Sequence, residues 1–522
     1  MEVKAITVHP ERIVFELGAP CGAEITIRER AAVINAKPGR LLSETRASAR
    51  EGRAVIDRFD GARDRLFSEF SLFAGSERAG GASYVTDFSA DVPANIEPYP
   101  RPDTIKALHA SDEDRRCLRI GQETYNINLL AIMTLNPEGA ICYERGGYFY
   151  YFIRERVEAI DRHMIRAYEM GVLPTFILLN APRLFHSTGE RALLEAAVHP
   201  AYDWNYKMAY ISAFDMRTEE GQRYYRAFCE FLAERYTRPD HAYGRAGGAI
   251  ISNEVNCPYI WGNAGEMAVE DYAREYAQAL RQCWLAGRKH AAYFRVYASF
   301  THHWTGTHDP REPLKFYQGR ALLDAIADWA KRDGDFDWHM AYHPYPEDLN
   351  AADFWHDRSA DFTFSTSRIT FKNMEVLEAY MSQERFLYRG EPRRVIFSEQ
   401  GFNSVDGPLR EISEKDGEAG YVLAYLKARN MKTVDMFFHH AYTDNPREFG
   451  LNLGIRRYDA NAEMNAGEKK PIYGAVRDMD TPAEAKRVAK ARAHIGEALF
   501  DYLLDPPLVM GDRDASKDEE FG

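Results

Sequence analysis

The chain has 522 residues, of which 45% are hydrophobic, 13% aromatic and 28% charged. This composition supports a large apolar core and excludes intrinsically disordered, collagen-like and coiled-coil proteins. Asp and Glu outnumber Lys and Arg by 79 to 66, and the net charge of −13 disfavours binding to nucleic acid, whose phosphates require a basic surface. No run of about 18 apolar residues occurs, so we expect no membrane span.

The N-terminal segment MEVKAITVHPERIVFEL carries charges throughout and lacks the apolar region of a signal peptide. Six cysteines are scattered over the chain without a CxxC motif, which favours reduced thiols over a disulfide framework. We therefore expect a cytoplasmic protein. The sequence does not predict an oligomeric state.

Residues 1–88 have the pattern of a small all-β domain. Short apolar runs are separated by Gly, Pro and charged clusters, and Ile13, Phe15 and Leu17 alternate as one face of a half-buried strand would. No long helical period interrupts these runs. We expect a β-sandwich.

Residues 89–103 contain Pro93, Pro98, Pro100 and Pro102, a density that excludes both a helix and a central strand. This segment is therefore predicted to be a linker. At the other end of the chain, residues 511–522 are polar and are predicted to form a frayed tail.

Between residues 104 and 510, amphipathic helical patterns alternate with short apolar runs, which is typical of a parallel sheet built from βα units. Eight runs are candidate strands: 125–131, 174–180, 206–214, 248–254, 292–298, 336–343, 394–400 and 434–440. Eight strands over about 400 residues predict a (β/α)8 barrel enlarged by loops. An open doubly wound sheet is the alternative, but no Gly-rich phosphate turn follows the first strand.

Two of the predicted strands carry a glutamate at their last or second-to-last position. The fourth ends in Ser252-Asn253-Glu254 and the seventh in Ser398-Glu399-Gln400. Strand alternation places Glu254 on the face of Ile250, and Glu399 on the face of Phe397, so that both can point into the barrel mouth. Two carboxylates that face one cleft are the groups that glycoside hydrolysis requires.

With Asn253-Glu254 on the fourth strand and Glu399 on the seventh, the chain resembles the clan A glycoside hydrolases, which are retaining (β/α)8 enzymes. The phrases HHWT (302–305), AYHPYP (341–346) and FSEQGF (397–402) are also similar to a bacterial branch described only as a domain of unknown function. The resemblance implies that Glu254 is the acid/base, that Glu399 is the nucleophile, that Asn253 binds the sugar 2-hydroxyl, and that a β-type bond of an oligo- or polysaccharide is cleaved. It implies no cofactor and no metal.

Other polar and aromatic side chains at or just after predicted strand ends are candidates for binding sugar hydroxyls. They are Asn180, Asp215, His302, His303, Trp304, His343, Tyr345, His440 and Tyr442. The chain has His439-His440-Ala441-Tyr442 where clan A enzymes often carry a tryptophan at the end of strand eight. The long segments 344–371 and 441–480 are expected to shape or cap the cleft.

Two other functions fit parts of the sequence. Sixteen histidines, with two His-His pairs, suggest a metal-dependent hydrolase, but neighbouring histidines on a strand point to opposite faces and the predicted first strand has none. A non-catalytic carbohydrate-binding barrel is the other alternative. The N-terminal β domain has no obvious aromatic platform and is expected to brace the barrel.

Overall fold

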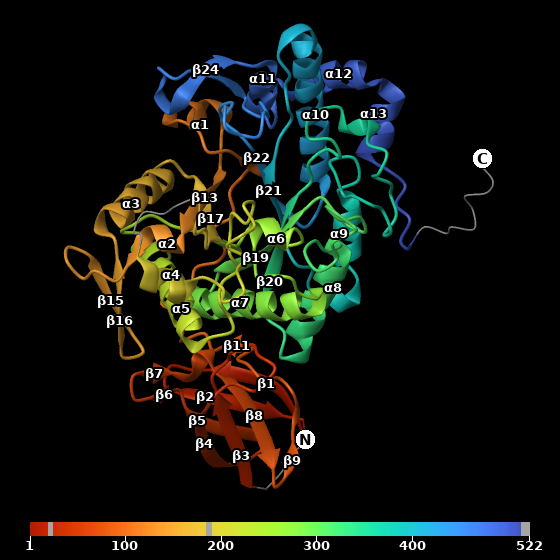
Figure 1. Ribbon diagram of the computed structural model, residues 1–522. Helices are drawn as coiled ribbons and strands as arrows, with labels where there is room; N and C mark the ends of the chain where they lie inside the picture. Colours follow the sequence, from red (N-terminus) through yellow and green to blue (C-terminus); the bar gives the residue numbers. More distant parts are fainter. Residues whose placement is uncertain (19–23, 184–189, 513–522) are drawn as a thin grey trace.

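The computed structural model describes residues 1–18, 24–183 and 190–512. Cys21 and almost all of the predicted tail lie outside these ranges. An all-β N-terminal part precedes an eight-stranded parallel barrel wrapped by helices, which confirms the predicted fold class (Figure 1).

The N-terminal part consists of two small sheets that pack face to face and of the short hairpin β6 (Phe59–Asp60) and β7 (Arg63–Asp64). One sheet contains β1 (Glu2–Val8), β2 (Arg12–Leu17), β5 (Arg53–Asp57), β10 (Gly80–Gly81) and β11 (Asp87–Phe88). The other contains β3 (Glu24–Arg30), β4 (Leu41–Ser48), β8 (Glu69–Ala74) and β9 (Glu77–Arg78). Phe15 of β2 and Phe70 of β8 meet between the sheets with ring centroids 5.2 Å apart. Ile13 and Leu17 are buried as their alternation predicts.

The barrel closes through eight parallel strands in chain order. They are β12 (Lys106–Ala107), β13 (Gln122–Asn128), β17 (Leu173–Leu179), β18 (Gly248–Ile251), β19 (Arg295–Thr301), β20 (Trp338–His343), β21 (Val395–Gln400) and β22 (Val434–His439). The main helices around it are α3 (Arg154–Glu169), α5 (Glu219–Tyr236), α7 (Val269–His290), α8 (Gly319–Arg332), α9 (Glu375–Met381) and α10 (Arg410–Asn430).

Smaller elements decorate this frame. A three-stranded sheet consists of β14 (Met133–Thr134), β15 (Ile141–Arg145) and β16 (Tyr148–Phe152). Its β15–β16 hairpin projects below α3 and beside α5 in Figure 1. Further helices are α1 (Asp112–Leu118), α2 (Leu129–Ile132), α4 (Arg191–Ala197), α6 (Pro258–Trp261), α11 (Pro471–Asp478), α12 (Glu484–Ile495) and α13 (Glu497–Leu504). After β22, the loop carries the short pair β23 (Arg456–Tyr458) and β24 (Ala466–Lys469).

One of the predicted barrel strands was wrong and one was missed. Segment 206–214 is not a barrel strand: it folds over the cleft, where Ser212 N–H donates to Asn180 O at 2.7 Å and Tyr210 N–H donates to Ile260 O at 3.0 Å. The true first strand, β12, has only two residues and no apolar run, so its sequence has no strand pattern. These two errors cancel in the numbering, and β18 and β21 remain strands four and seven.

The barrel interior is filled by apolar side chains. Ile177, Ile250, Tyr297, Ile396 and Met436 come from five different strands and form one buried cluster. A filled interior leaves the open ends of the strands as the place for a site.

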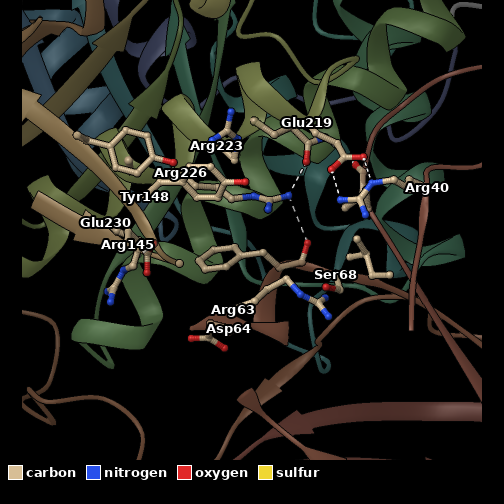
Figure 2. Close-up of a pocket in the computed structure, with 18 residues that line it drawn as sticks. Arg40, Arg63, Asp64, Ser68, Arg145, Tyr148, Glu219, Arg223, Arg226 and Glu230 are labelled. Atoms are coloured by element: carbon tan, nitrogen blue, oxygen red, sulfur yellow. Dashed lines mark hydrogen bonds and ion pairs between the residues drawn. The ribbon is translucent and has the colours of Figure 1, made fainter. Parts of the chain in front are cut away.

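The β sandwich packs on the flank of the barrel, against α5 and α7. Arg40 makes a bidentate ion pair with Glu219 at the start of α5, with N–O distances of 3.0 and 2.8 Å. Lys289 of α7 lies 3.0 Å from Asp64. Figure 2 shows the small arginine-rich cavity, of about 160 Å³, that remains between the sandwich, the β15–β16 hairpin and α5.

These contacts support the expectation that the N-terminal part braces the barrel. The segment predicted as a linker also contacts the barrel, since Asn95 N–H donates to His290 O at 2.9 Å. Within the described residues, no helix is both long and apolar enough to cross a bilayer.

Candidate active site

A cleft of about 860 Å³ opens at the carboxyl ends of the barrel strands. This volume is in the range that holds a small ligand or a short oligomer. Both glutamates singled out in the sequence, Glu254 and Glu399, line it. The loops after β20 and β22 contribute Tyr345, Glu448 and Phe449 to its walls, as their length predicted.

Glu254 reaches the cleft through a turn rather than by strand alternation. β18 ends at Ile251, and Ser252 and Glu254 both adopt left-handed backbone conformations, with φ of 62° and 39°. Glu254 N–H donates to Ser299 Oγ at 3.0 Å, and Cys257 N–H closes the turn onto Glu254 O at 2.7 Å. Non-glycine residues in this conformation are strained, and such strain gathers at functional sites.

Glu399 is also placed by a local irregularity. Ile396 belongs to the cluster inside the barrel, whereas Val395 and Phe397 pack on the outer side with the helices. Regular alternation would therefore turn Glu399 outward, contrary to the sequence-based reasoning. The register between β21 and β22 shifts between Phe397 and Gln400, and this bulge turns Glu399 into the cleft.

His343, at the end of β20, connects the two glutamate-bearing strands. Its Nδ1 lies 2.9 Å from Glu254 Oε1 and its Nε2 lies 3.1 Å from Ser398 Oγ, next to Glu399. The ring is 1% exposed. Burial alone would lower the pKa of His343, but the charges of Glu399 and Glu254 and the hydrogen bond to Glu254 raise it above its usual value.

Tyr345 and His440 complete the polar surround of Glu399. The Tyr345 hydroxyl donates to Glu399 Oε1 at 3.2 Å, and burial together with the charge of Glu399 raises the pKa of this phenol. His440 Nε2 lies 3.2 Å from Glu448 Oε1. Burial opposes the charging of His440, yet the hydrogen bond to Glu448 and the charge of Glu399 raise its pKa.

His302 and His303 follow β19 and both border the cleft, with ring centroids 4.7 Å apart. They lie beyond the last strand residue, Thr301, so the expectation that neighbouring histidines face opposite sides does not hold for them. Burial lowers the pKa of His302 to about 4 and that of His303 to about 2. Both imidazoles are therefore neutral near pH 7.

Two groups in the described residues have the spacing of metal ligands. One is Cys257, His303 and His308, and the other is His109, Glu123 and His163. In the second group, Arg115 already neutralises the buried Glu123 at 2.5 Å. Neither group contains both members of a His-His pair.

A family model covers most of the chain. The model of a family of unknown function, DUF5722, matches residues 98–502. The chain belongs to this family. The match agrees with the predicted resemblance to a branch of unknown function. No curated protein matches the sequence of this DUF5722 member.

Solved glycoside hydrolases have folds similar to that of this DUF5722 chain at low identity. A family 39 glycoside hydrolase from Bacteroides cellulosilyticus WH2 is 14% identical, with a TM-score of 0.43, over 91% of this chain and 81% of its own. A family 1 β-glucosidase from Thermotoga maritima is 13% identical, with a TM-score of 0.42, over 72% and 85%. A β-glucosidase from Pyrococcus furiosus is 14% identical, with a TM-score of 0.44, over 75% and 86%.

The structure of the DUF5722 chain divides the predicted binding residues into two sets. Five line the cleft: Asn253, His302, His303, Tyr345 and His440. Five do not: Asn180, Asp215, Trp304, His343 and Tyr442. Of the second set, only His343 is bonded to a glutamate of the cleft.

The other four residues outside the cleft lining have structural partners. The Asn180 amide donates to Ala197 O at 2.8 Å, and Asp215 accepts from Arg217 N–H at 2.7 Å before α5. The fully buried Trp304 indole donates to Phe364 O at 2.9 Å, and the Tyr442 hydroxyl donates to Asp114 at 2.7 Å. A polar residue after a strand can equally bind its own loop.

Several cleft residues were not singled out by the sequence reasoning. Asn126 is the one exposed residue of β13, and it lines the cleft. A polar residue at an inward position of a barrel strand is the signal that could have identified it. Tyr210 was also not singled out; its ring centroid lies 5.2 Å from that of Trp261, with the two planes tilted by 31°. Glu448 and Phe449 lie in the loop after β22, where no periodicity marks them.

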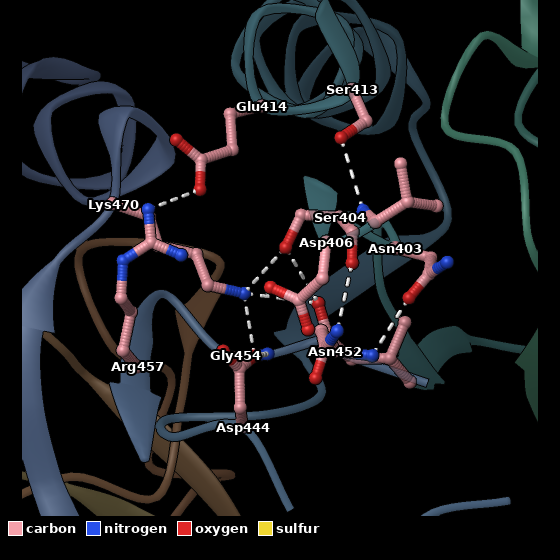
Figure 3. Close-up of polar contacts among 12 residues, drawn as sticks. Asn403, Ser404, Asp406, Ser413, Glu414, Asp444, Asn452, Gly454, Arg457 and Lys470 are labelled. Carbon is pink, nitrogen blue, oxygen red and sulfur yellow. Dashed lines mark hydrogen bonds and ion pairs between the residues drawn. The ribbon is translucent and has the colours of Figure 1, made fainter. Parts of the chain in front are cut away.

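A buried lysine holds that loop in place (Figure 3). Lys470 Nζ donates to Ser404 Oγ at 2.8 Å, to Asn452 O at 3.0 Å and to Asp444 Oδ1 at 2.5 Å. Its side chain is 2% exposed and that of Asp444 is 11% exposed. The network joins the loop after β21 to the loop after β22 and so fixes the segment that carries Glu448 and Phe449.

Proposed function

We propose that this protein is a retaining glycoside hydrolase that cleaves a β-type bond in an oligo- or polysaccharide. The observation that carries the proposal is that Glu254 and Glu399, from strands four and seven, line one cleft. His343 contacts Glu254 with one ring nitrogen and Ser398, next to Glu399, with the other. The carboxyl end of a (β/α)8 barrel is the usual place of its active site. A pair of carboxylates is the machinery of glycoside hydrolysis.

In the first proposed step, Glu399 attacks the anomeric carbon while Glu254 gives a proton to the leaving oxygen. In the second step, Glu254 takes a proton from water, which displaces Glu399. The Tyr345 hydroxyl donates to Glu399 Oε1 and so orients the carboxylate of the nucleophile. His343 acts as a positioning residue because it contacts Glu254 and lies outside the cleft lining.

The cleft walls suit a sugar. Trp261 and Tyr210 offer an aromatic face, and Phe449, which is 73% exposed, stands at the mouth. Asn253 and Asn126 present amides that make no side-chain hydrogen bond within the described residues, so both can pair with hydroxyls. This combination of apolar faces and unpaired amides is what recognition of a neutral polyol requires. The mechanism needs no cofactor.

The proposal is tested by turnover of a panel of nitrophenyl β-glycosides and oligosaccharides. Glu399→Gln is expected to lower kcat by at least ~10³-fold, and Glu254→Ala by ~10²-fold or more on substrates with poor leaving groups. Glu266→Gln is the matched control, because Glu266 is an exposed carboxylate that does not line the cleft. It should stay within about twofold of wild type.

The stereochemistry tests the double displacement itself. Azide should partly rescue Glu254→Ala by forming a β-glycosyl azide, and NMR should show the product with retained configuration. Inversion at the anomeric carbon would contradict the assignment of Glu399 as nucleophile. Wild-type turnover in both glutamate variants would remove the proposal.

A further inference from the structure

Three side chains with nitrogen and sulfur donors meet in one wall of the cleft. Cys257 follows β18, and His303 and His308 follow β19. One donor atom from each lies within 4.8 Å of the other two. All three border the cleft, in which a cation can reach them from solvent.

The other buried histidines of the described chain each make at least one hydrogen bond through a ring nitrogen, and His303 makes none. His199 contacts Glu275 at 2.9 Å, His343 contacts Glu254, and His439 contacts Leu453 O at 3.0 Å. His303 is 8% exposed, and its buried Nδ1 has no hydrogen-bond partner. A buried ring nitrogen without a partner destabilises the fold unless it binds something that the chain does not itself supply.

The surrounding backbone holds the cluster in shape. The side chain of Asn256, next to Cys257, donates to His303 O at 3.1 Å and accepts from Thr301 N–H at 2.9 Å. The His308 ring packs on Phe316 with centroids 4.8 Å apart. The donors therefore stand on two loops that are tied to each other, which lowers the cost of bringing them together around an ion.

We propose that Cys257, His303 and His308 form a binding site for a zinc-type divalent cation. A thiolate with two imidazoles is a donor set that zinc prefers, and a set without carboxylates is unsuited to calcium or magnesium. On binding, the Cys257 S–H bond breaks heterolytically, the proton goes to solvent and the sulfur lone pair bonds the metal, with no change of oxidation state. The fourth position faces the cleft.

The site adjoins the proposed acid/base. Cys257 N–H donates to Glu254 O at 2.7 Å, so an ion bound to Cys257 sits beside the turn that carries this glutamate. We expect zinc to lower turnover by occupying the cleft wall, and this consequence alone depends on the proposed hydrolase function. Binding of the ion does not.

The test is titration of the metal-free full-length protein with Zn²⁺ alone and, in parallel, with Co²⁺. We expect one tight equivalent of zinc. With cobalt we expect the intense visible bands of a tetrahedral ion and a sulfur-to-cobalt charge-transfer band. Cys257→Ser should abolish that band, and Cys257→Ser and His303→Asn should each weaken zinc binding by at least ~100-fold.

His302→Asn is the matched control, since His302 borders the same cleft but lies outside the cluster. It should bind zinc as wild type does, and unfolding midpoints of all variants without metal show whether each is folded. Equal zinc affinity in wild type and Cys257→Ser, or a cobalt spectrum without the sulfur band, would overturn the site. Binding in a protein that cleaves no glycoside would uphold the site and count against the proposed function only.

Discussion

The buried pair Lys470–Asp444 gives a quantitative test of what holds the cleft loop. Replacing Lys470 by Met keeps the length of the side chain but removes three hydrogen bonds, and it leaves Asp444 charged and buried beside Gly454 N–H. Breaking one partner of a buried pair costs about 3–5 kcal/mol. We therefore expect the free energy of unfolding to fall by that amount in Lys470→Met.

The double variant separates the cost of leaving the Asp444 charge buried without a partner from the cost of the lost hydrogen bonds. Lys470→Met with Asp444→Asn removes both charges while the asparagine still accepts from Gly454 N–H, so the loss should shrink to about 1–2 kcal/mol. Lys415→Met is the matched surface control: it breaks the exposed pair with Glu411, whose side chain is 81% exposed, and should cost about 0.5 kcal/mol or less.

The assay is urea unfolding followed in parallel by tryptophan fluorescence and circular dichroism. Coincident transitions permit two-state free energies, and the midpoint shift then reports stability. Because the network fixes the segment with Glu448 and Phe449, Lys470→Met should also raise KM more than it lowers kcat. If Lys470→Met destabilises the protein no more than Lys415→Met does, burial does not make the Lys470–Asp444 pair costly to break, and the prediction is refuted.

Three further predictions follow from contacts described above. The pKa of His343 is raised in the folded protein, so protonation of this histidine stabilises the fold below its unfolded pKa of about 6.5, and the stabilisation is lost as the pH rises through the folded pKa. The difference in unfolding midpoint between wild type and His343→Asn should therefore narrow from pH ~6 to ~9. A difference that widens over this range would contradict the prediction. Phe449→Ala should raise KM roughly fivefold, worth about 1 kcal/mol, at unchanged stability; an unaltered KM would remove its role in substrate binding. Trp304→Ala should instead cost about 3–5 kcal/mol in urea unfolding, because this side chain is wholly buried; a loss below about 1 kcal/mol would refute that.

Much of the fold was predictable from sequence because apolar runs and helical stripes are repeated along the barrel. The missed strand β12 and the wrongly predicted strand 206–214 have one cause, which is that strands were identified from runs of apolar residues. β12 is only two residues long and includes the buried Lys106, whereas segment 206–214 is apolar because Met208, Tyr210 and Ile211 form a wall of the cleft. Hydrophobicity reports burial or a ligand surface, and it cannot tell a barrel strand from an apolar cleft wall.

Both glutamates were singled out from their place at strand ends, but the physical reason was incomplete. Regular alternation does not deliver either one: Glu254 follows a left-handed turn and Glu399 follows a bulge. Such irregularities depend on contacts with neighbouring strands, such as the bond from Glu254 N–H to Ser299 Oγ, which no local pattern encodes. The same limit explains why Trp304 and Tyr442 were expected in the cleft.

The cleft is lined, among the described residues, only by positions from Asn126 onward, while the β sandwich contacts the flank at α5 and α7. The residues that line the cleft and the residues that attach the sandwich to the flank therefore lie largely on separate stretches of the chain. In chimaeras that exchange the first 88 residues among family members, the ligand preference should be that of the protein that supplies the barrel. Only the stability of the protein should change. A sandwich that fits its new flank poorly would uncover Trp284, which packs on Phe88 with ring centroids 5.4 Å apart, and would favour aggregation.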